Sequence, residues 1–360
     1  MSKKKICFIA QFPPPIHGLS KAVDTLYNSR LQEKYEFEKI NITDNKKIFL
    51  NLLQLIKSDA DLFYFTISQT KGGNLRDLII FKLLEVRGKK CLIHLHGGYY
   101  RQLVDYHMPL WQRKANYKAV KKLAGAIVLG KSLKSIFVGM LDNRKIFVVP
   151  NCVDDKYVMA QPQFELKQNT LTKRNVKHIL FLSNMIRTKG YPVLLELAKE
   201  EKLRCDAGAV CKYHFDFCGE FFSEDEEQYF NDYIQKYGLN DYVTYHGVVV
   251  GDEKRAFLKK SDFFALPTRY PKEGQPISII EAMANGLYII TTDHAGIPDL
   301  VTNGVNGIVL RKSQQLKLNM LDKAQISQVA KKNREIAQSK YSEIFYIRNM
   351  ERCFEEVLSK

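Results

Sequence analysis

The stretch "HILFLSNMIRTKGYPVLLELAKE", residues 178 to 200, decides the fold class. It opens with a short apolar run typical of a buried strand and passes through a polar turn that ends in Lys189 and Gly190. It then continues with the apolar spacing of a helix. A strand that leads through a short loop into a helix is the repeating unit of a parallel sheet covered on both faces. The stretch therefore predicts an α/β fold.

The same unit recurs on both sides of this stretch. Apolar runs that indicate strands precede it at 6–12, 37–42, 61–67, 91–97, 125–130 and 145–151, and follow it at 214–220, 243–249, 262–268, 288–293 and 307–310. We interpret the polar stretch 161–177 as a linker. The pattern predicts two doubly wound Rossmann-like domains, at 1–165 and 166–340, that face each other across a cleft. An amphipathic C-terminal helix at 341–360 could pack back on the first domain.

Length and composition agree with this prediction. The chain has 360 residues, enough for two ordinary domains, and its 45% hydrophobic and 26% charged content is that of a folded protein. No run of about 18 apolar residues occurs, which excludes a membrane-spanning helix. The seven cysteines are scattered without a C-x-x-C pair, so we expect reduced thiols in a cytoplasmic protein rather than disulfides or zinc.

The net charge of +16 is unevenly distributed. Residues 1–150 hold 26 Lys and Arg against 11 Asp and Glu, whereas residues 151–360 hold 29 against 28. This asymmetry suggests that the first domain faces something anionic, either nucleic acid or a membrane surface, and a solvated lysine-rich surface is an equal alternative. The basic stretches 3–5 and 111–122 contribute to the excess, and the second could form a partly amphipathic helix at a membrane.

Two loops of the second half contain candidate functional residues. In one, Lys189 and Gly190 precede a helix, and an ammonium group beside the free N–H groups of a helix N-terminus suits a diphosphate. In the other, "EGQPISIIE" (273–281) places Glu273 in a loop and Glu281 inside the next helix, so the two are not a glycosidase acid–base pair. Carboxylates also accept hydrogen bonds from vicinal hydroxyls, so this spacing suits a nucleotide sugar. Glu281 alone would also be explained by favourable charge near a helix N-terminus.

The segment 267–310, "PTRYPKEGQPISIIEAMANGLYIITTDHAGIPDLVTNGVNGIVL", resembles the signature of family 4 glycosyltransferases. It shows the E-x7-E spacing, then E-A-M-A-x-G, a Gly-Ile-Pro turn and an N-G-x-x-G turn, and weaker matches extend over nearly the whole chain. The resemblance implies the two-domain GT-B fold, a nucleotide sugar held by the second domain and an acceptor on the first. It also implies transfer with retention, a UDP- or GDP-linked donor, no cofactor and no required metal.

The resemblance also assigns roles by position. The catalytic residues would be Glu273 on the donor sugar's hydroxyls, His96 near that sugar and Lys189 on the diphosphate. Glu281 would bind the ribose, and the segment from Gly274 to Ile277 would offer backbone N–H groups. The donor-binding set is Asn184, Arg187, Arg269, Gly274, Gln275, Pro276, Ile277 and Glu281.

Two departures from the family pattern concern the residues expected to contact phosphate or acceptor. The family usually has Gly-Arg where Ser183 and Asn184 stand, so Arg187 or Arg269 would supply the second cation. The acceptor or phosphate loop, which commonly contains Gly-Gly, here contains His17 and Gly18. A glycine at this point lets the backbone approach a ligand closely.

We therefore predict a retaining hexosyl- or N-acetylhexosaminyltransferase that acts on a lipid-linked or oligosaccharide acceptor in capsular, exopolysaccharide or O-antigen synthesis. We expect it in the cytoplasm, or peripheral on the inner face of the membrane through its basic first half. A sugar-nucleotide epimerase of the same fold is an alternative, and it would leave its product on the nucleotide. The other alternative is a non-catalytic protein that binds an anionic polymer. We expect no nucleic-acid partner, because no binding motif accompanies the charge.

Overall fold

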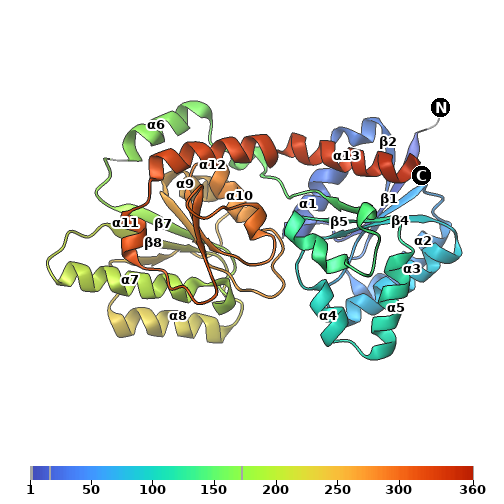
Figure 1. Cartoon of the computed structure of the whole chain (residues 1–360), viewed down its shortest axis with the longest axis horizontal. Coiled ribbons are helices and arrows are strands. Elements are labelled where there is room, and N and C mark those ends of the chain that lie inside the picture. Colours follow the sequence, from blue (N-terminus) through green and yellow to red (C-terminus); the bar gives the residue numbers. More distant parts are fainter. Residues whose placement is uncertain (1–2, 16–17, 172, 360) are drawn as a thin grey trace. The chain divides into compact units, whose positions relative to one another are not determined.

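The computed structural model describes residues 3–15, 18–171 and 173–359. They form two compact units, and each unit is built around a six-stranded sheet with helices on both faces (Figure 1). Unit 1 comprises Met1–Cys152, Pro271–Gln275 and Glu343–Lys360, and unit 2 comprises Val153–Tyr270 and Pro276–Ser342. Every strand pair in both sheets is parallel, which confirms the predicted class of two doubly wound α/β domains.

Unit 1 has the strand order β2-β1-β3-β4-β5-β6. Its strands are β1 (Lys4–Ala10), β2 (Tyr35–Asn41), β3 (Leu62–Thr66), β4 (Lys90–Leu95), β5 (Gly125–Val128) and β6 (Ile146–Val148). Its α-helices are α1 (Gly18–Tyr27), α2 (Ile48–Lys57), α3 (Lys71–Val86), α4 (Tyr100–Tyr106), α5 (Leu110–Lys121) and α13 (Glu343–Ser359). The order reverses between β1 and β3, so ligands of such a sheet gather at the carboxyl ends of these strands.

The C-terminal helix α13 packs on one face of the unit 1 sheet. Its Phe354 lies against the rings of Phe8 and Tyr64, which point to this face from β1 and β3. The Lys90 ammonium donates to the carbonyls of Val357 and Leu358 at the end of the helix, at 3.2 and 3.1 Å. Ile344, in the first turn of the helix, is exposed and lies outside its buried stripe.

Unit 2 has the strand order β12-β11-β10-β7-β8-β9. Its strands are β7 (Lys177–Leu182), β8 (Tyr213–Cys218), β9 (Val243–Tyr245), β10 (Phe263–Leu266), β11 (Tyr288–Thr292) and β12 (Gly307–Leu310). Its α-helices are α6 (Gln161–Leu171), α7 (Tyr191–Asp206), α8 (Glu224–Tyr237), α9 (Gly251–Lys260), α10 (Ile277–Ala284), α11 (Leu318–Asp322) and α12 (Ile326–Lys340). The order reverses between β7 and β10, and the loops after these two strands therefore mark the switch point of unit 2.

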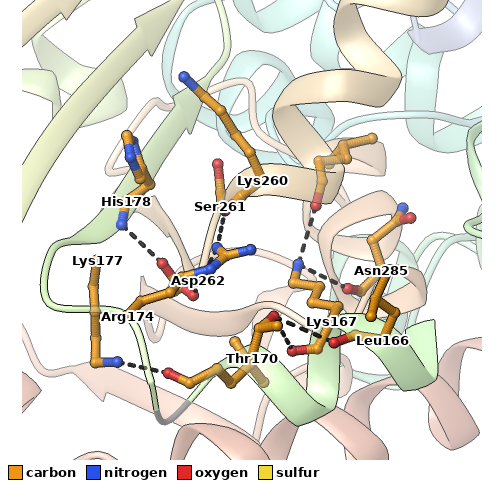
Figure 2. Close-up of polar contacts among 12 residues, drawn as sticks. Leu166, Lys167, Thr170, Arg174, Lys177, His178, Lys260, Ser261, Asp262 and Asn285 are labelled. Carbon is orange, nitrogen blue, oxygen red and sulfur yellow. Dashed lines mark hydrogen bonds and ion pairs between the residues drawn. The ribbon is translucent and has the colours of Figure 1, made fainter. Parts of the chain in front are cut away.

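The polar stretch 161–177, which we interpreted as a linker, lies within unit 2. It forms helix α6, which docks on unit 2, and the change of unit lies at residues 152–153 rather than at 165–166. Phe164 packs so closely against Gly286 that a Cβ there would lie 2.4 Å from its ring. The buried Lys167 ammonium donates to the carbonyls of Leu258 and Asn285, at 3.2 and 3.3 Å (Figure 2). Because a polar residue of this stretch is buried and packs on unit 2, the polar composition of the stretch did not indicate a linker.

Lys167 should make stability depend on pH. Burial lowers the pKa of Lys167 from 10.5 to about 7. The negative charge of Asp262 opposes this shift, and the positive charge of Arg174 adds a smaller lowering. Between these pKa values the unfolded chain binds a proton that the folded chain does not, so stability rises with pH across this window. We expect the free energy of unfolding of the wild type, relative to Lys167→Met, to rise by about 2 kcal/mol from pH 7 to pH 9. Urea unfolding of the wild type and of Lys167→Met at pH 7 and pH 9 measures this change. If the free energy of unfolding changes equally with pH in both proteins, Lys167 is not a neutral buried lysine.

The cysteine prediction was wrong for one pair. Cys205 and Cys211 form a disulfide with a Cα–Cα distance of 5.4 Å, because α7 ends at Asp206 and the chain turns back into β8 within a few residues. The other five cysteines are free thiols, as expected. Within residues 3–15, 18–171 and 173–359, no helix is both long and apolar enough to cross a bilayer.

Candidate functional site

The two loops at the switch point of unit 2 are held together. The backbone N–H of Arg269, after β10, donates to the Thr188 carbonyl, after β7, at 2.7 Å. Gly190 has a φ of 95°, and a Cβ there would lie 2.4 Å from the Pro267 carbonyl oxygen. Only glycine fits both the left-handed backbone and this close approach. The sequence pair Lys-Gly thus fixes the lysine at the point where an α/β sheet binds its ligand.

Lys189 lies against an aromatic ring at this point. Its Nζ is 5.1 Å from the ring centroid of Tyr270, a distance typical of a cation–π contact. Helix α7 begins directly after Gly190 and has no side-chain N-cap, so its first N–H groups are not occupied by a capping side chain. An ammonium group and the positive end of a helix therefore converge here, as an anionic ligand requires.

Both candidate arginines already have carboxylate partners. The Arg187 Nε lies 3.2 Å from Glu226 Oε2, its guanidinium also pairs with Asp225, and it therefore turns toward α8. The Arg269 Nη1 lies 2.6 Å from Asp293 Oδ1, and its Nη2 donates to a backbone carbonyl. Either guanidinium would have to give up a charged partner to bind a diphosphate. The exposed Asn184 at the end of β7 provides no charge.

Glu281 is a buried carboxylate of helix α10. Its side chain is 5% exposed, and its Oε1 lies 2.7 Å from the Nζ of Lys254 on α9. Burial raises the pKa of Glu281, and the Lys254 charge opposes this shift. The Lys254 ammonium also lies over the Tyr157 ring, at 4.3 Å. The carboxylate is therefore fixed in position by a cation that the sequence pattern did not identify, 27 residues earlier in the chain.

The loop that contains Glu273 belongs to unit 1 although its flanking residues belong to unit 2. A Cβ on Gly274 would lie 2.4 Å from the His96 carbonyl oxygen and 2.9 Å from the Gly97 Cα. Glycine is required because backbone lies directly against backbone. Glu273, which is buried, therefore lies in a loop packed at the carboxyl end of β4, next to His96. The structure thus brings Glu273, Gly274 and His96 together within unit 1.

Gln275 anchors this loop with its side chain. Its Nε2 donates to the Leu129 carbonyl at 2.9 Å, and its Oε1 accepts from the Asn151 N–H at 2.8 Å. The Asn151 side chain donates to the Gln275 carbonyl at 2.9 Å. Because both ends of the amide are occupied, Gln275 positions the loop, and only its backbone N–H could serve the predicted donor contact.

His96 is supported by two buried residues. Its ring lies 3.9 Å from the His94 ring, centroid to centroid, and His94 Nδ1 lies 2.7 Å from the Tyr64 hydroxyl oxygen. Burial lowers the pKa of His94 well below its ordinary value, so this ring is neutral near pH 7. Sequence reasoning missed Tyr64, because a tyrosine in a buried strand has no local mark of its partner on the next strand.

The remaining predicted residues lie as follows. Pro276 has no N–H, so it cannot be one of the backbone donors predicted between Gly274 and Ile277. Ile277 is the first residue of α10, and that helix has no side-chain N-cap. Gly18 is the first residue of α1, and His17 lies outside the described residues.

The chain is similar in sequence and in fold to known proteins. The family model described as "Glycosyl transferases group 1" matches residues 162–337, which is most of unit 2. The amylovoran biosynthesis glycosyltransferase AmsK of Erwinia amylovora is 26% identical over 44% of this chain and 39% of its own length. The UDP-Gal:alpha-D-GlcNAc-diphosphoundecaprenol alpha-1,3-galactosyltransferase of Escherichia coli is 24% identical over 75% of this chain and 68% of its own length.

The chain spans 36% to 71% of the length of its curated relatives. Among solved structures, Anabaena Alr3699/HepE in complex with UDP has a TM-score of 0.74 at 15% identity, over 98% of this chain and 99% of that one. This likeness concerns the fold, and together with the two doubly wound sheets it confirms the predicted GT-B class.

Proposed function

We propose that this chain is a retaining glycosyltransferase that moves a sugar from a nucleoside-diphosphate sugar to a lipid-linked or oligosaccharide acceptor. The observation that carries the proposal is the close contact of Gly190 with Pro267, which fixes Lys189 at the switch point of unit 2. The family model matches this same unit. The packing of Gly274 on His96 supports the assignment of Glu273 and His96 to the sugar.

In the proposed reaction a bond forms between an acceptor oxygen and the anomeric carbon as the bond from that carbon to the diphosphate breaks. The proton of the acceptor hydroxyl passes to the leaving phosphate oxygen, so no enzyme nucleophile is needed. Lys189 and the start of α7 would stabilise the negative charge that develops on the diphosphate. We propose that the reaction uses no cofactor and no metal ion. Glu273 would hold the donor sugar, and Glu281 the ribose.

The names of two relatives support the acceptor and the cellular setting that we propose. One relative is named for amylovoran biosynthesis, and another for galactosyl transfer to a diphosphoundecaprenol-linked GlcNAc. We propose that this chain acts in the assembly of a surface polysaccharide, on a glycan carried by a lipid at the cytoplasmic face of the membrane. A hexose or an N-acetylhexosamine linked to UDP or GDP is the donor that we propose.

A nucleotide-sugar panel tests the donor site. At about 100 times its dissociation constant, the correct donor should add about 2.7 kcal/mol of stability to the fold. The expected result is a higher melting temperature with one of the UDP-, GDP- or ADP-sugars, and no comparable shift with the free sugar. Lys189→Met should lose most of that shift. If no member of the panel moves the melting temperature of the wild type, the donor site is not where we place it.

A further inference from the structure

Helix α2 of unit 1 has apolar side chains on both sides. One side packs on the sheet and α3, where Leu55 lies beside Ile9, Ile40 and Ile80. On the other side four large apolar side chains are exposed: Phe49 by 80%, Leu50 by 53%, Leu53 by 55% and Ile56 by 49%. Residues four and three positions apart lie on one face of a helix, so Phe49, Leu53 and Ile56 form a continuous apolar stripe. We call these four residues the α2 apolar face.

The charged residues within the segment 45–57 are all positive. Lys46 and Lys47 come just before the helix and Lys57 ends it, and residues 45–57 contain no Asp or Glu. All three lysines are exposed, and none of their ammonium groups forms an ion pair with another described residue. An apolar stripe flanked by lysines suits the interface of an anionic bilayer, where the apolar side chains enter the acyl boundary and the ammonium groups meet lipid headgroups.

The neighbouring helix extends the same surface. The Arg87 guanidinium at the end of α3 donates to the carbonyls of Leu55 and Ser58, at 2.6 and 2.7 Å, and Arg76 near its start contacts Asn45. Helices α2 and α3 therefore run side by side. On α3, Leu75 and Ile79 are exposed by 42% and 52%. Figure 1 shows α2, α3 and α5 on the same side of the unit 1 sheet, away from α13.

We propose that the α2 apolar face inserts into the interface of an anionic membrane and docks unit 1 on it. Phe49 and Leu50 lie in the first turn of α2, which follows β2, so they lie toward the carboxyl edge of the sheet, as His96 does after β4. A lipid-linked acceptor held by this membrane would reach that edge without leaving the bilayer surface. The acceptor part of this inference rests on the proposed function, whereas the docking itself does not.

Two single-tryptophan proteins test which helix inserts. The chain has one tryptophan, Trp111, on α5. The wild type therefore monitors α5, and the double variant Phe49→Trp with Trp111→Phe monitors α2. Each is mixed with vesicles of phosphatidylcholine containing about 30% phosphatidylglycerol. We expect emission from position 49 to shift to the blue and to be quenched by lipids brominated on their acyl chains. A shift at Trp111 with none at position 49 would overturn the proposal in favour of α5.

Vesicle sedimentation of the full chain gives the affinity. Phe49→Ser with Leu53→Ser should weaken binding to anionic vesicles by about tenfold or more. Lys46→Gln with Lys47→Gln should weaken it by about tenfold at low salt and have little effect at high salt. The matched control is Phe222→Ser with Val248→Ser, two side chains of unit 2 with exposed fractions of 71% and 61%, which should bind as the wild type does. Equal loss in this control would contradict a specific α2 face.

Two further measurements distinguish membrane docking from self-association and from donor binding. A concentration-dependent dimer that disappears in Phe49→Ser with Leu53→Ser, without any vesicle binding, would show that the face meets a second copy, and would overturn the proposal. The donor-induced melting shift should be the same in that variant as in the wild type. A wild type that shows the donor shift but binds no vesicles would overturn the docking and leave the proposed function standing. A wild type that binds vesicles but shows no donor shift would overturn the proposed function and leave the docking standing.

Discussion

Replacing Glu273 by Gln should lower the rate of sugar transfer by about 100-fold or more, with the fold intact. The side chain is buried in a loop that Gln275 fixes to Leu129 and Asn151. Glutamine has the same size as glutamate, so the loop should keep its position and lose only the negative charge. We propose that this charge orients the donor sugar's hydroxyls and favours the positive anomeric carbon of the transition state. Turnover of donor and acceptor under saturating conditions measures the effect.

Two controls make this result specific to the site. The variant Glu335→Gln changes an exposed carboxylate on α12 of unit 2, and it should transfer sugar at the wild-type rate. The melting temperature and the donor-induced shift of Glu273→Gln should show that the variant is folded and binds nucleotide. Transfer by Glu273→Gln within about threefold of the wild type would remove this residue from the proposed site.

Replacing Lys189 by Met should lower turnover by about 100-fold and weaken donor binding. Methionine keeps the apolar stem that lies near Tyr270 and removes the only charge of the Lys189 side chain. Because Arg187 and Arg269 are paired with carboxylates, we expect neither to replace it. Steady-state kinetics should show a fall in kcat together with a rise in KM for the donor, because the diphosphate is bound in both the ground state and the transition state.

The chain offers a matched control for this lysine. Lys199, also on the chain segment that follows β7, places its Nζ 4.1 Å from the ring centroid of Tyr237, in a cation–π contact of the same kind. Lys199 lies in the middle of α7, away from the loop end of the strand. Lys199→Met should therefore keep wild-type kinetics. Equal losses in the two variants would mean that the lysine over Tyr270 supports the fold rather than the diphosphate.

Local patterns predicted the fold class well. Alternation of apolar runs with helical spacing found both sheets, because buried parallel strands are apolar on both faces and leave a clear mark in the sequence. The stretch 161–177 was misread as a linker because the residues that dock α6 include a buried lysine, whose carbonyl partners lie about 90 and 120 residues further on. Likewise, the apolar run of α2 would be assigned to a core, although four of its seven large apolar side chains are exposed.

The candidate site was predictable only in part. Lys189 and Gly190 could be proposed from the sequence because a lysine beside a glycine at the start of a helix is a local pattern that suits an anionic ligand. The partners of Arg187, Arg269 and Glu281 were not, because ion pairs between different elements leave no local pattern. Nor could spacing show that residues 271–275 belong to unit 1, since this depends on the close approach of Gly274 to His96.

Transfer of a labelled sugar tests the central claim most directly. The donor, chosen by the melting-shift panel, is labelled in its sugar and incubated with the full chain and a diphosphoundecaprenol-linked GlcNAc in anionic vesicles. The account predicts that the label moves into the lipid fraction, that free nucleoside diphosphate appears in equal amount, and that both depend on the acceptor. Two results would contradict this account. In one, the label stays on the nucleotide as an altered nucleotide sugar, and in the other it stays unchanged on the donor with every donor and glycan acceptor tested.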